Sequence, residues 1–557
     1  MEKVYMNSQL LRIVIYLTYS EAPNILSTIG EPLGEAAFMP KVGEQEKASA
    51  PRELPLIQVR LRPQDRKGVE DHFLETDANP GLELTKYPRV AKLLQNRKFQ
   101  FLTIVPNQLI FWFVILIGFV GTADPGLNFG TAITWYIWFA LVFVLMVVVG
   151  RAWCLMCPFG GFGEWIQRKT FWKRTQARLG LGLKFPERIA QYGFLTSIGA
   201  FVLLTWLEEF FNIAGPGNPT ATSYMVLGIV ASALLFFLVY ERRTFCRYVC
   251  PLSGLIGTVG SMGMAAGFRT RDREVCLTCE TKDCMRGGEN GYGCPWYTWP
   301  GSSDSNAACG LCSECYKGCP SGNVGLYVQR PLTSVIAPSR RRADIAWSVA
   351  ILWGLVIYQQ VNALPAYATI DDWLNKLMSF PQYPNPVDYL AVIGGVSVLM
   401  AGISWLAANY FAASDLIIPN GGDNFLSRTS TFRAFFFPIM YGLIPVVGSD
   451  YFARQLPKLF KHATRIVPAV GHLFGAGSAS SSLYKTSILT DPSIVTAQLV
   501  VIALGTLAAM WASWRIARRD LVPLTDYRRG IQVAAVSIAG LCGLVASVLY
   551  VLMSAAD

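Results

Sequence analysis

Long apolar stretches separated by short polar connectors recur from about residue 101 to the C-terminal end of the chain. Each stretch is close to the ~20 residues that a helix needs to cross the hydrocarbon core of a bilayer. The pattern predicts about nine transmembrane helices, at residues 101–120, 132–149, 192–211, 224–240, 345–364, 389–411, 432–447, 494–514 and 533–553. The seventh stretch is the shortest. The pattern therefore favours an all-α polytopic membrane protein.

Two regions lack this pattern. Residues 1–100 are mostly polar and rich in Glu, Lys, Pro and Asp between 40 and 80, a composition typical of a partly disordered extension. Residues 57–61 alternate and predict one short strand there. Residues 269–330 are polar and rich in cysteine. The chain thus divides into an extension (1–100), a four-span membrane half (101–268), a cysteine segment (269–330) and a C-terminal membrane half of about five spans (340–557).

Composition agrees with this division. The chain is 52% hydrophobic and 15% charged, whereas a soluble protein carries about 25% charged residues. Its net charge of +11 comes from basic residues beside the apolar stretches, and they form no separate basic domain. That placement favours the positive-inside rule over nucleic-acid binding. We therefore expect the lipid bilayer, and no nucleic acid, as a partner.

The basic residues also predict an orientation. If the spans alternate, residues 168–178, 241–247, 340–342 and 515–529 fall on one side, together with the N-terminal extension and the cysteine segment. We take that side as the cytoplasm, with the C-terminus outside, in a bacterial inner membrane type of arrangement. Arg454, Lys458, Lys461 and Arg465 are the exception, because they fall on the outward side. Either they lie on an amphipathic surface helix, or the seventh span does not cross.

Eight of the thirteen cysteines lie between residues 276 and 319. The later four follow the spacing C-x2-C-x2-C-x3-C-P of bacterial ferredoxins. The earlier four have the same order with longer later gaps. Two such runs predict two [4Fe-4S] clusters in an inserted ferredoxin-like α+β segment, because each iron of a cubane takes one soft thiolate. The two runs are Cys276, Cys279, Cys284 and Cys294, then Cys309, Cys312, Cys315 and Cys319.

In such paired runs the fourth cysteine binds the other cluster. The spacing therefore assigns Cys276, Cys279, Cys284 and Cys319 to one cubane, and Cys309, Cys312, Cys315 and Cys294 to the second. The glycine-rich insertion at 285–293 leaves the placement of Cys284 and Cys294 open. A zinc site and a disulfide scaffold are the alternatives, since C-x2-C pairs also occur there.

Two further cysteine pairs follow the second and fourth predicted spans and form an internal repeat. Each pair ends in Cys-Pro and has an arginine upstream. The first has Arg151, Cys154 and Cys157, and the second has Arg243, Cys246 and Cys250. Three interpretations stay open: a third metal centre, a redox thiol pair, or inert cysteines at helix ends. The arginines either lower the thiol pKa values or simply follow the positive-inside rule.

Paired Cys-Pro corners followed by a two-cluster ferredoxin segment resemble the membrane-bound polyferredoxins of nitrous-oxide reduction and periplasmic nitrate reduction. The resemblance covers about residues 101–326. It implies electron relay between a quinol pool or cytoplasmic donor and a partner redox enzyme, with no catalytic acid–base residues. The chain departs in its shorter first corner and in lacking a recognisable outward flavin-binding domain. An assembly factor that reduces a metal or disulfide, and a transporter with a structural or sensory Fe-S domain, are the alternatives.

Overall fold

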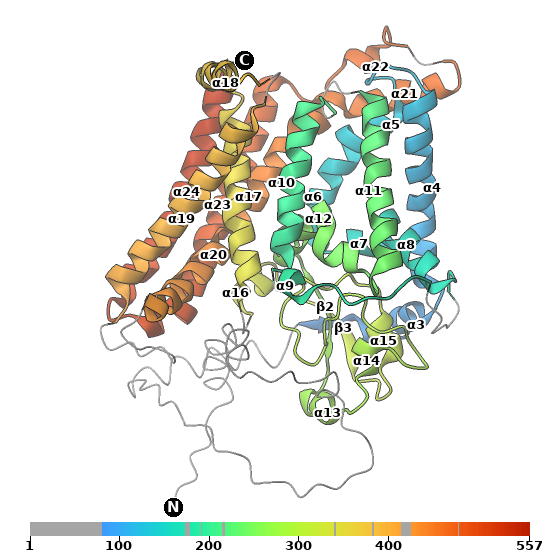
Figure 1. The fold of residues 1–557 in the computed structure, drawn as a ribbon, viewed down its shortest axis with the longest axis vertical. Coiled ribbons are helices and arrows are strands. Elements are labelled where there is room, and N and C mark those ends of the chain that lie inside the picture. Colours follow the sequence, from blue (N-terminus) through green and yellow to red (C-terminus); the bar gives the residue numbers. More distant parts are fainter. Residues whose placement is uncertain are drawn as a thin grey trace, which may run out of the picture.

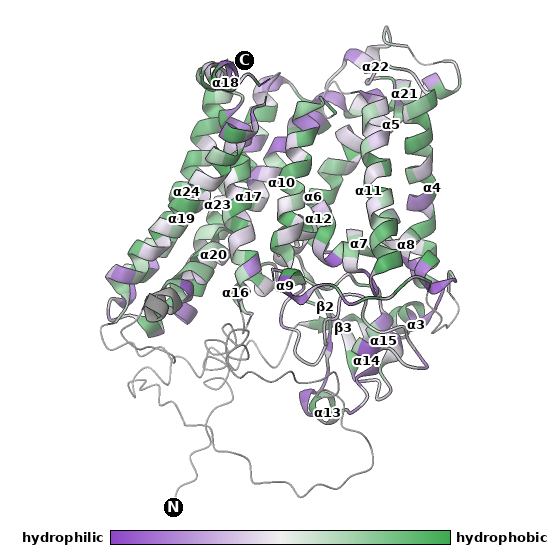
Figure 2. Ribbon diagram, in the orientation of Figure 1, coloured by the Kyte–Doolittle hydropathy of each residue, from purple (hydrophilic) through white to green (hydrophobic). Residues whose placement is uncertain are grey.

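The computed structural model describes residues 81–172, 179–190, 192–213, 218–338, 341–380, 384–413, 425–476 and 478–556. The strand predicted at 57–61 lies outside the described residues. Long helices pack side by side into a bundle, and a small sheet lies beyond one end of it (Figure 1). The long helices are apolar over most of their length (Figure 2).

In the described part of the chain, eight helical stretches are long and apolar enough to cross a membrane. They contain α4 (Phe99–Val120), α6 (Phe139–Val149), α11 (Pro219–Val239), α17 (Ala343–Val361), α19 (Pro386–Phe411), α20 (Phe425–His462), α23 (Asp491–Ile516) and α24 (Arg528–Ala556). The predicted third span forms α10 (Phe194–Phe210), whose 17 residues are at the short end of the range for a spanning helix. It packs within the bundle against α17.

Helix starts at the end of the bundle away from the sheet follow from local sequence. Asn218 and Asn385 precede α11 and α19, and each accepts hydrogen bonds from backbone N–H groups of the first turn. A proline then occupies the first helical position, where its missing N–H costs nothing. Asn128 caps α5 (Phe129–Thr131), which leads through the π-helical segment η2 (Ala132–Trp138) into α6. Capped polar connectors thus set where these helices begin.

The sheet has three antiparallel strands in the order β1-β3-β2. β2 (Ala265–Thr270) and β3 (Val324–Val328) flank the cysteine segment, so their pairing closes it into one loop. β1 (Leu82–Glu83) and α3 (Pro88–Gln95) come from the region expected to be a polar extension. Leu94 packs in one cluster with Phe268 and Val324. Residues 82–95 therefore pack with the cysteine segment, whose strands are too distant in sequence for a local pattern to reveal this.

The seventh predicted span belongs to α20, which has 38 residues and packs against α23, α17 and α19. Its basic residues have partners in the protein. Arg454 donates to the Gln359 carbonyl at 2.6 Å and lies 3.9 Å from the Glu209 carboxylate of α10. The ammonium of Lys458 lies over the Trp135 ring at 5.5 Å. These basic residues are therefore held by neighbouring helices, while η5 (Ala463–Arg465) and α21 (Ile466–Leu473) continue the chain at that end of the bundle.

Short helices carry the two Cys-Pro corners. The first corner consists of α7 (Trp153–Met156) and α8 (Pro158–Arg168), and the second of η3 (Phe245–Val249) and α12 (Pro251–Val259). α12 turns back into the bundle, where it packs against α10, α17 and α20 (Figure 1). The cysteine segment lies directly beyond this end of the bundle, with the short helices α13 (Arg273–Thr278), α14 (Asp283–Arg286) and α15 (Glu314–Gly318).

Candidate iron-sulfur sites

The two corners meet at one cavity. Its wall contains the four corner cysteines, Cys154, Cys157, Cys246 and Cys250, together with Arg243 and Trp296. Cys154 and Cys246 are buried, and Cys157 and Cys250 are half-buried. All thirteen cysteines of the chain are free thiols, so no disulfide links the corners. Residues about 90 positions apart thus converge four sulfur atoms on one space.

The Cys-Pro sequence explains how each corner presents its second thiol. Cys157 and Cys250 stand in extended backbone immediately before α8 and α12, with proline at the first helical position. The N–H groups at the helix starts then act on the sulfur: those of Phe159 and Gly160 on Cys157, and those of Leu252 and Ser253 on Cys250. Free N–H groups at a helix N-terminus favour an anion. In each corner, these N–H groups therefore favour the thiolate form of the second cysteine, Cys157 or Cys250.

Burial opposes that charge. It raises the pKa of Cys157 to about 11 and that of Cys250 to about 12, and neighbouring corner thiols add to both increases. Four close thiols in a buried site stay neutral unless a cation compensates them. Metal binding provides that compensation and releases the thiol protons. The donor set is therefore suited to a metal centre that takes thiolate ligands.

The two arginines of the repeat reach across to the opposite corner. Arg151 Nε donates to Cys154 Sγ at 3.3 Å, and the same guanidinium donates to the Ser253 hydroxyl of α12. Arg243 donates to the Cys154 carbonyl at 3.1 Å and to the Glu164 carboxylate of α8 at 2.7 Å. Each arginine stands three residues before the first cysteine of its own corner. This exchange of contacts locks the two corners together.

Other atoms around the cavity also fit a bound group. A Cβ at Gly160 would come 3.3 Å from Cys246 Sγ, so a larger residue would crowd the thiols. Trp296 also lines the cavity, and its buried Nε1 has no hydrogen-bond partner within the described part of the chain. Among the described residues, no three His, Cys, Asp or Glu side chains are arranged to hold one metal ion.

In the cysteine segment, the thiols near Cys284 are the other three of the first predicted set and Cys294 of the second. Burial raises the pKa of Cys284 to about 12, and the nearby thiols of Cys319, Cys276 and Cys279 raise it further. The sheet brings two of these together, because Asn323 precedes β3 and faces β2. Its backbone N–H donates to Cys319 Sγ at 3.3 Å, and its amide donates to Cys276 Sγ at 3.4 Å. Sequence analysis did not identify Asn323.

The second predicted set is also brought together. Burial raises the pKa of Cys294 to about 11, and Cys309 is the thiol that adds to this increase. Burial raises the pKa of Cys315 well above its ordinary value, with Cys294, Cys312 and Cys309 as the nearest contributing thiols. The long insertion therefore carries Cys294 to the loop that holds the later cysteines. The thiol of Cys284, from the first set, also raises the pKa of Cys315, so the two predicted sets lie next to each other.

A glycine in β2 makes room for this loop. Gly267 has φ +85° and lies where the strand register shifts, and a Cβ there would come 2.8 Å from Cys309 Sγ. Only glycine adopts that backbone conformation without strain, and only glycine leaves the sulfur its place. The sequence signal for it is weak, because one glycine within a strand has many explanations.

Buried ionic contacts fasten the cysteine segment to the first corner. The Glu164 carboxylate of α8 pairs with Arg168 and with Arg243, which is 2.5 Å away. Arg168 lies over the Tyr292 ring at 3.6 Å. The backbone N–H of Tyr292 donates to the Glu314 carboxylate of α15 at 3.0 Å. The cysteine segment is therefore held in a fixed position against the corners.

A 4Fe-4S binding domain family matches the chain twice, at residues 131–175 and 222–268. Each match contains one long helix and one Cys-Pro corner. The chain carries a 4Fe-4S binding domain. No curated protein and no solved structure matches it. With its apolar helices, the protein is an iron-sulfur, metal-binding membrane protein. The matches end before residue 276, so they support the corners as iron-sulfur elements independently of the ferredoxin-like spacing.

Proposed function

We propose that the protein relays single electrons and holds three iron-sulfur centres. Two [4Fe-4S] clusters would be bound in the cysteine segment, one by Cys276, Cys279, Cys284 and Cys319 and the other by Cys294, Cys309, Cys312 and Cys315. The four corner cysteines would hold the third centre. Bound clusters supply reversible one-electron chemistry over a wide range of potentials. The protein's own part is to hold the sulfur ligands, exclude water and compensate charge.

The observation that carries this proposal is the convergence of the four corner thiols on one cavity that adjoins the second cysteine set. Trp296 lines the cavity and follows Cys294 by two residues. Arg151, which donates to Cys154, also donates to the Ala307 carbonyl at 2.6 Å, two residues before Cys309. A residue close to Cys294 and a residue close to Cys309 therefore both contact the corners.

The three thiol sets also lie in an order. Two cysteines of the first set, Cys279 and Cys319, are partly exposed, whereas in the second set Cys309 is partly exposed and the other three are buried. The corners lie next to the bundle, and α13 lies farthest from it in Figure 1. This order supports an electron path between solvent at the first set and the membrane at the corners. This path would connect a quinol pool with a partner redox enzyme, as the resemblance to membrane polyferredoxins implies.

Iron content tests the third centre. Replacing Cys157 and Cys250 together by serine should lower iron and acid-labile sulfide per chain and remove one signal from low-temperature paramagnetic resonance. The matched control is Cys542→Ser, because Cys542 is buried in α24 away from the other cysteines. If the iron content per chain is unchanged in the double variant, the corner thiols bind no cluster and only contribute to packing.

We further propose that the sheet end faces the cytoplasm and the C-terminus faces outward. Basic residues gather at the sheet end, among them Arg341, Arg342 and Arg519. α24 ends at the opposite end of the bundle (Figure 1). An alkaline phosphatase fusion after Ser302 should be inactive. An active fusion would invert this orientation. The assembly-factor and transporter alternatives have no specific contact in their favour among the described residues.

A further inference from the structure

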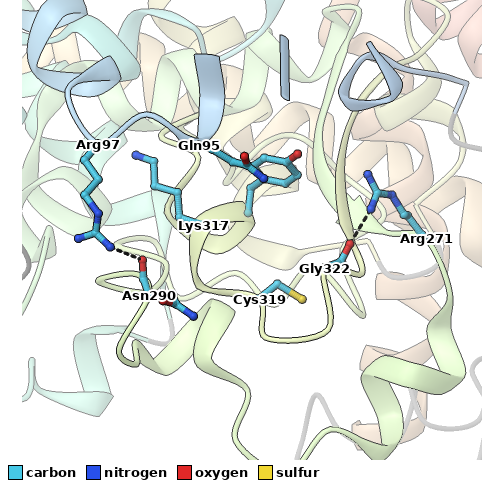
Figure 3. A pocket seen from close by; sticks show the side chains of 8 residues that line it. Gln95, Arg97, Arg271, Asn290, Lys317, Cys319 and Gly322 are labelled. Atoms are coloured by element: carbon cyan, nitrogen blue, oxygen red, sulfur yellow. Dashed lines mark hydrogen bonds between the residues drawn. The ribbon is translucent and has the colours of Figure 1, made fainter. Parts of the chain in front are cut away.

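A polar pocket of about 330 Å³ opens beside the first cysteine set (Figure 3). Cys319 forms part of its wall, and the side chains of Arg97, Arg271 and Lys317 surround it. These three cations come from separate parts of the fold: the connection between α3 and α4, the end of β2, and α15. Their convergence on one thiol depends on the tertiary structure.

The pocket has a positive charge balance. Arg271 pairs with Glu83 at 2.6 Å, and Lys317 lies 3.2 Å from Glu314. Arg97 donates to the Asn290 carbonyl at 3.3 Å. Three of the residues that line the pocket are cations, and none of its lining residues is a carboxylate. The partners thus hold the cations in place, and the charge that faces the pocket is positive.

The shape and chemistry of the pocket fit carboxylates of a protein surface. Its volume is at the small end of the range for ligand sites, about 300–1,000 Å³, and those sites are mostly apolar. This pocket is mainly polar and open, lined by cations and by the Asn290 and Tyr316 side chains. Arg271 lies in the chain between β2 and α13, and α13 lies on the side away from the bundle (Figure 1). The position of Arg271 favours a soluble partner over a lipid headgroup.

We infer that this pocket is the docking site of an acidic one-electron carrier protein, which exchanges electrons next to Cys319. The inference rests on the proposed function, because Cys319 matters here as a cluster ligand. Acidic side chains of the carrier would pair with Arg97, Arg271 and Lys317. Complementary charge acts mainly on the rate of encounter, so the effect should depend on salt.

Stopped-flow kinetics on the full-length holoprotein in nanodiscs tests this inference. Reduced flavodoxin, an acidic carrier, and reduced methyl viologen, a cation, serve as the two electron donors. The test variant is Arg97→Gln, and the matched control is Lys92→Gln, which removes the same charge from exposed α3 outside the pocket. At low salt, Arg97→Gln should slow reduction by flavodoxin about fivefold and Lys92→Gln less than about twofold. High salt should remove the difference.

The outcomes separate the possibilities. Equal flavodoxin rates in Arg97→Gln and Lys92→Gln would overturn the docking site, provided that methyl viologen reduces all three proteins equally. An Arg97 effect that occurs only in nanodiscs with anionic phosphatidylglycerol would assign the pocket to a lipid headgroup instead. A wild-type protein that methyl viologen cannot reduce would overturn the proposed function itself, and this inference with it.

Discussion

Arg242 and Arg243 are adjacent in the chain, yet their guanidinium groups bind different parts of the molecule. Arg242 donates to the Met285 carbonyl at 2.5 Å and to the Cys294 carbonyl at 2.7 Å, both in the cysteine segment. Arg243 binds Glu164 in the first corner. The left-handed backbone of Arg242, with φ +49°, accompanies this divergence. One dipeptide therefore joins the corners to the cysteine segment.

Removing Arg242 should loosen that junction. Arg242→Ala would leave the buried carbonyl of Cys294 and the part-buried carbonyls of residues 285 and 286 without this donor, at a cost of about 2–4 kcal/mol. Limited proteolysis should then cut residues 271–323 faster than in wild type. Arg247→Ala is the control, because the Arg247 guanidinium lies over the Tyr248 and Tyr297 rings, at 4.7 and 4.6 Å from their centroids.

A second variant separates the lost contacts from backbone strain. Arg242→Gly removes the same hydrogen bonds but suits the positive φ better than alanine. It should be cut faster than wild type and more slowly than Arg242→Ala. Cleavage of both variants at the wild-type rate would contradict the fastening role of Arg242.

The assignment of cysteines to the two clusters predicts which cysteine variants weaken the same paramagnetic signal. Cys276→Ser and Cys319→Ser should weaken the same paramagnetic signal of the reduced protein, because Asn323 contacts both sulfur atoms. Cys294→Ser should instead weaken the signal that Cys312→Ser weakens. If Cys294→Ser matched Cys276→Ser, each run would bind its own cluster and the crossed assignment would be wrong.

The buried Glu164 predicts a pH effect on stability. Burial by itself raises its pKa, but Arg168 and Arg243 outweigh burial and hold the pKa below the usual range. Its contribution to stability is therefore complete above the ordinary carboxyl pKa and is lost as pH falls through the lowered value. Glu164→Gln should cost about 3–5 kcal/mol at neutral pH, since it leaves buried arginine charge uncompensated.

Thermal unfolding in nanodiscs between about pH 7 and pH 3 checks this. The gap in melting temperature between wild type and Glu164→Gln should narrow as pH falls, because acid removes the same charge from the wild type. A gap that stays constant over that range would show that the Glu164 charge does not stabilise the fold.

Trp296 predicts an effect on reduction potential. Its buried Nε1–H has no hydrogen-bond partner among the residues that the structure describes, the residue lines the corner cavity, and the centroid of its ring lies 3.9 Å from the Arg151 guanidinium. Donors to cluster sulfur favour the reduced, more negative state. Trp296→Phe keeps a ring under Arg151 and removes the N–H. This variant should lower the reduction potential of one centre without changing the iron content. An unaltered potential would mean that Trp296 contributes only to packing.

Much of the protein follows from its sequence alone. Apolar stretches near the length of a bilayer core give the helices, because a helix in lipid satisfies its own backbone hydrogen bonds. Asn-Pro pairs set where α11 and α19 begin. The ferredoxin-like spacing and the repeated Cys-Pro corners identify the cysteines, because thiolate ligation and helix N-termini are local chemistry. The span predicted at 192–211 is the 17-residue α10, which leaves out only Tyr192, Gly193 and Phe211 of that range.

The tertiary structure decided what lies far apart in the sequence. It brought the two corners to one cavity, placed Cys294 beside Cys315, and paired β1 with a strand about 240 residues away. It also showed Gly267 and Asn323 beside the sulfur atoms and Arg97 beside Cys319. Such contacts depend on how helices and strands pack, and packing leaves no fixed spacing along the chain. Sequence therefore determined which residues carry the chemistry, and packing determined which of them meet.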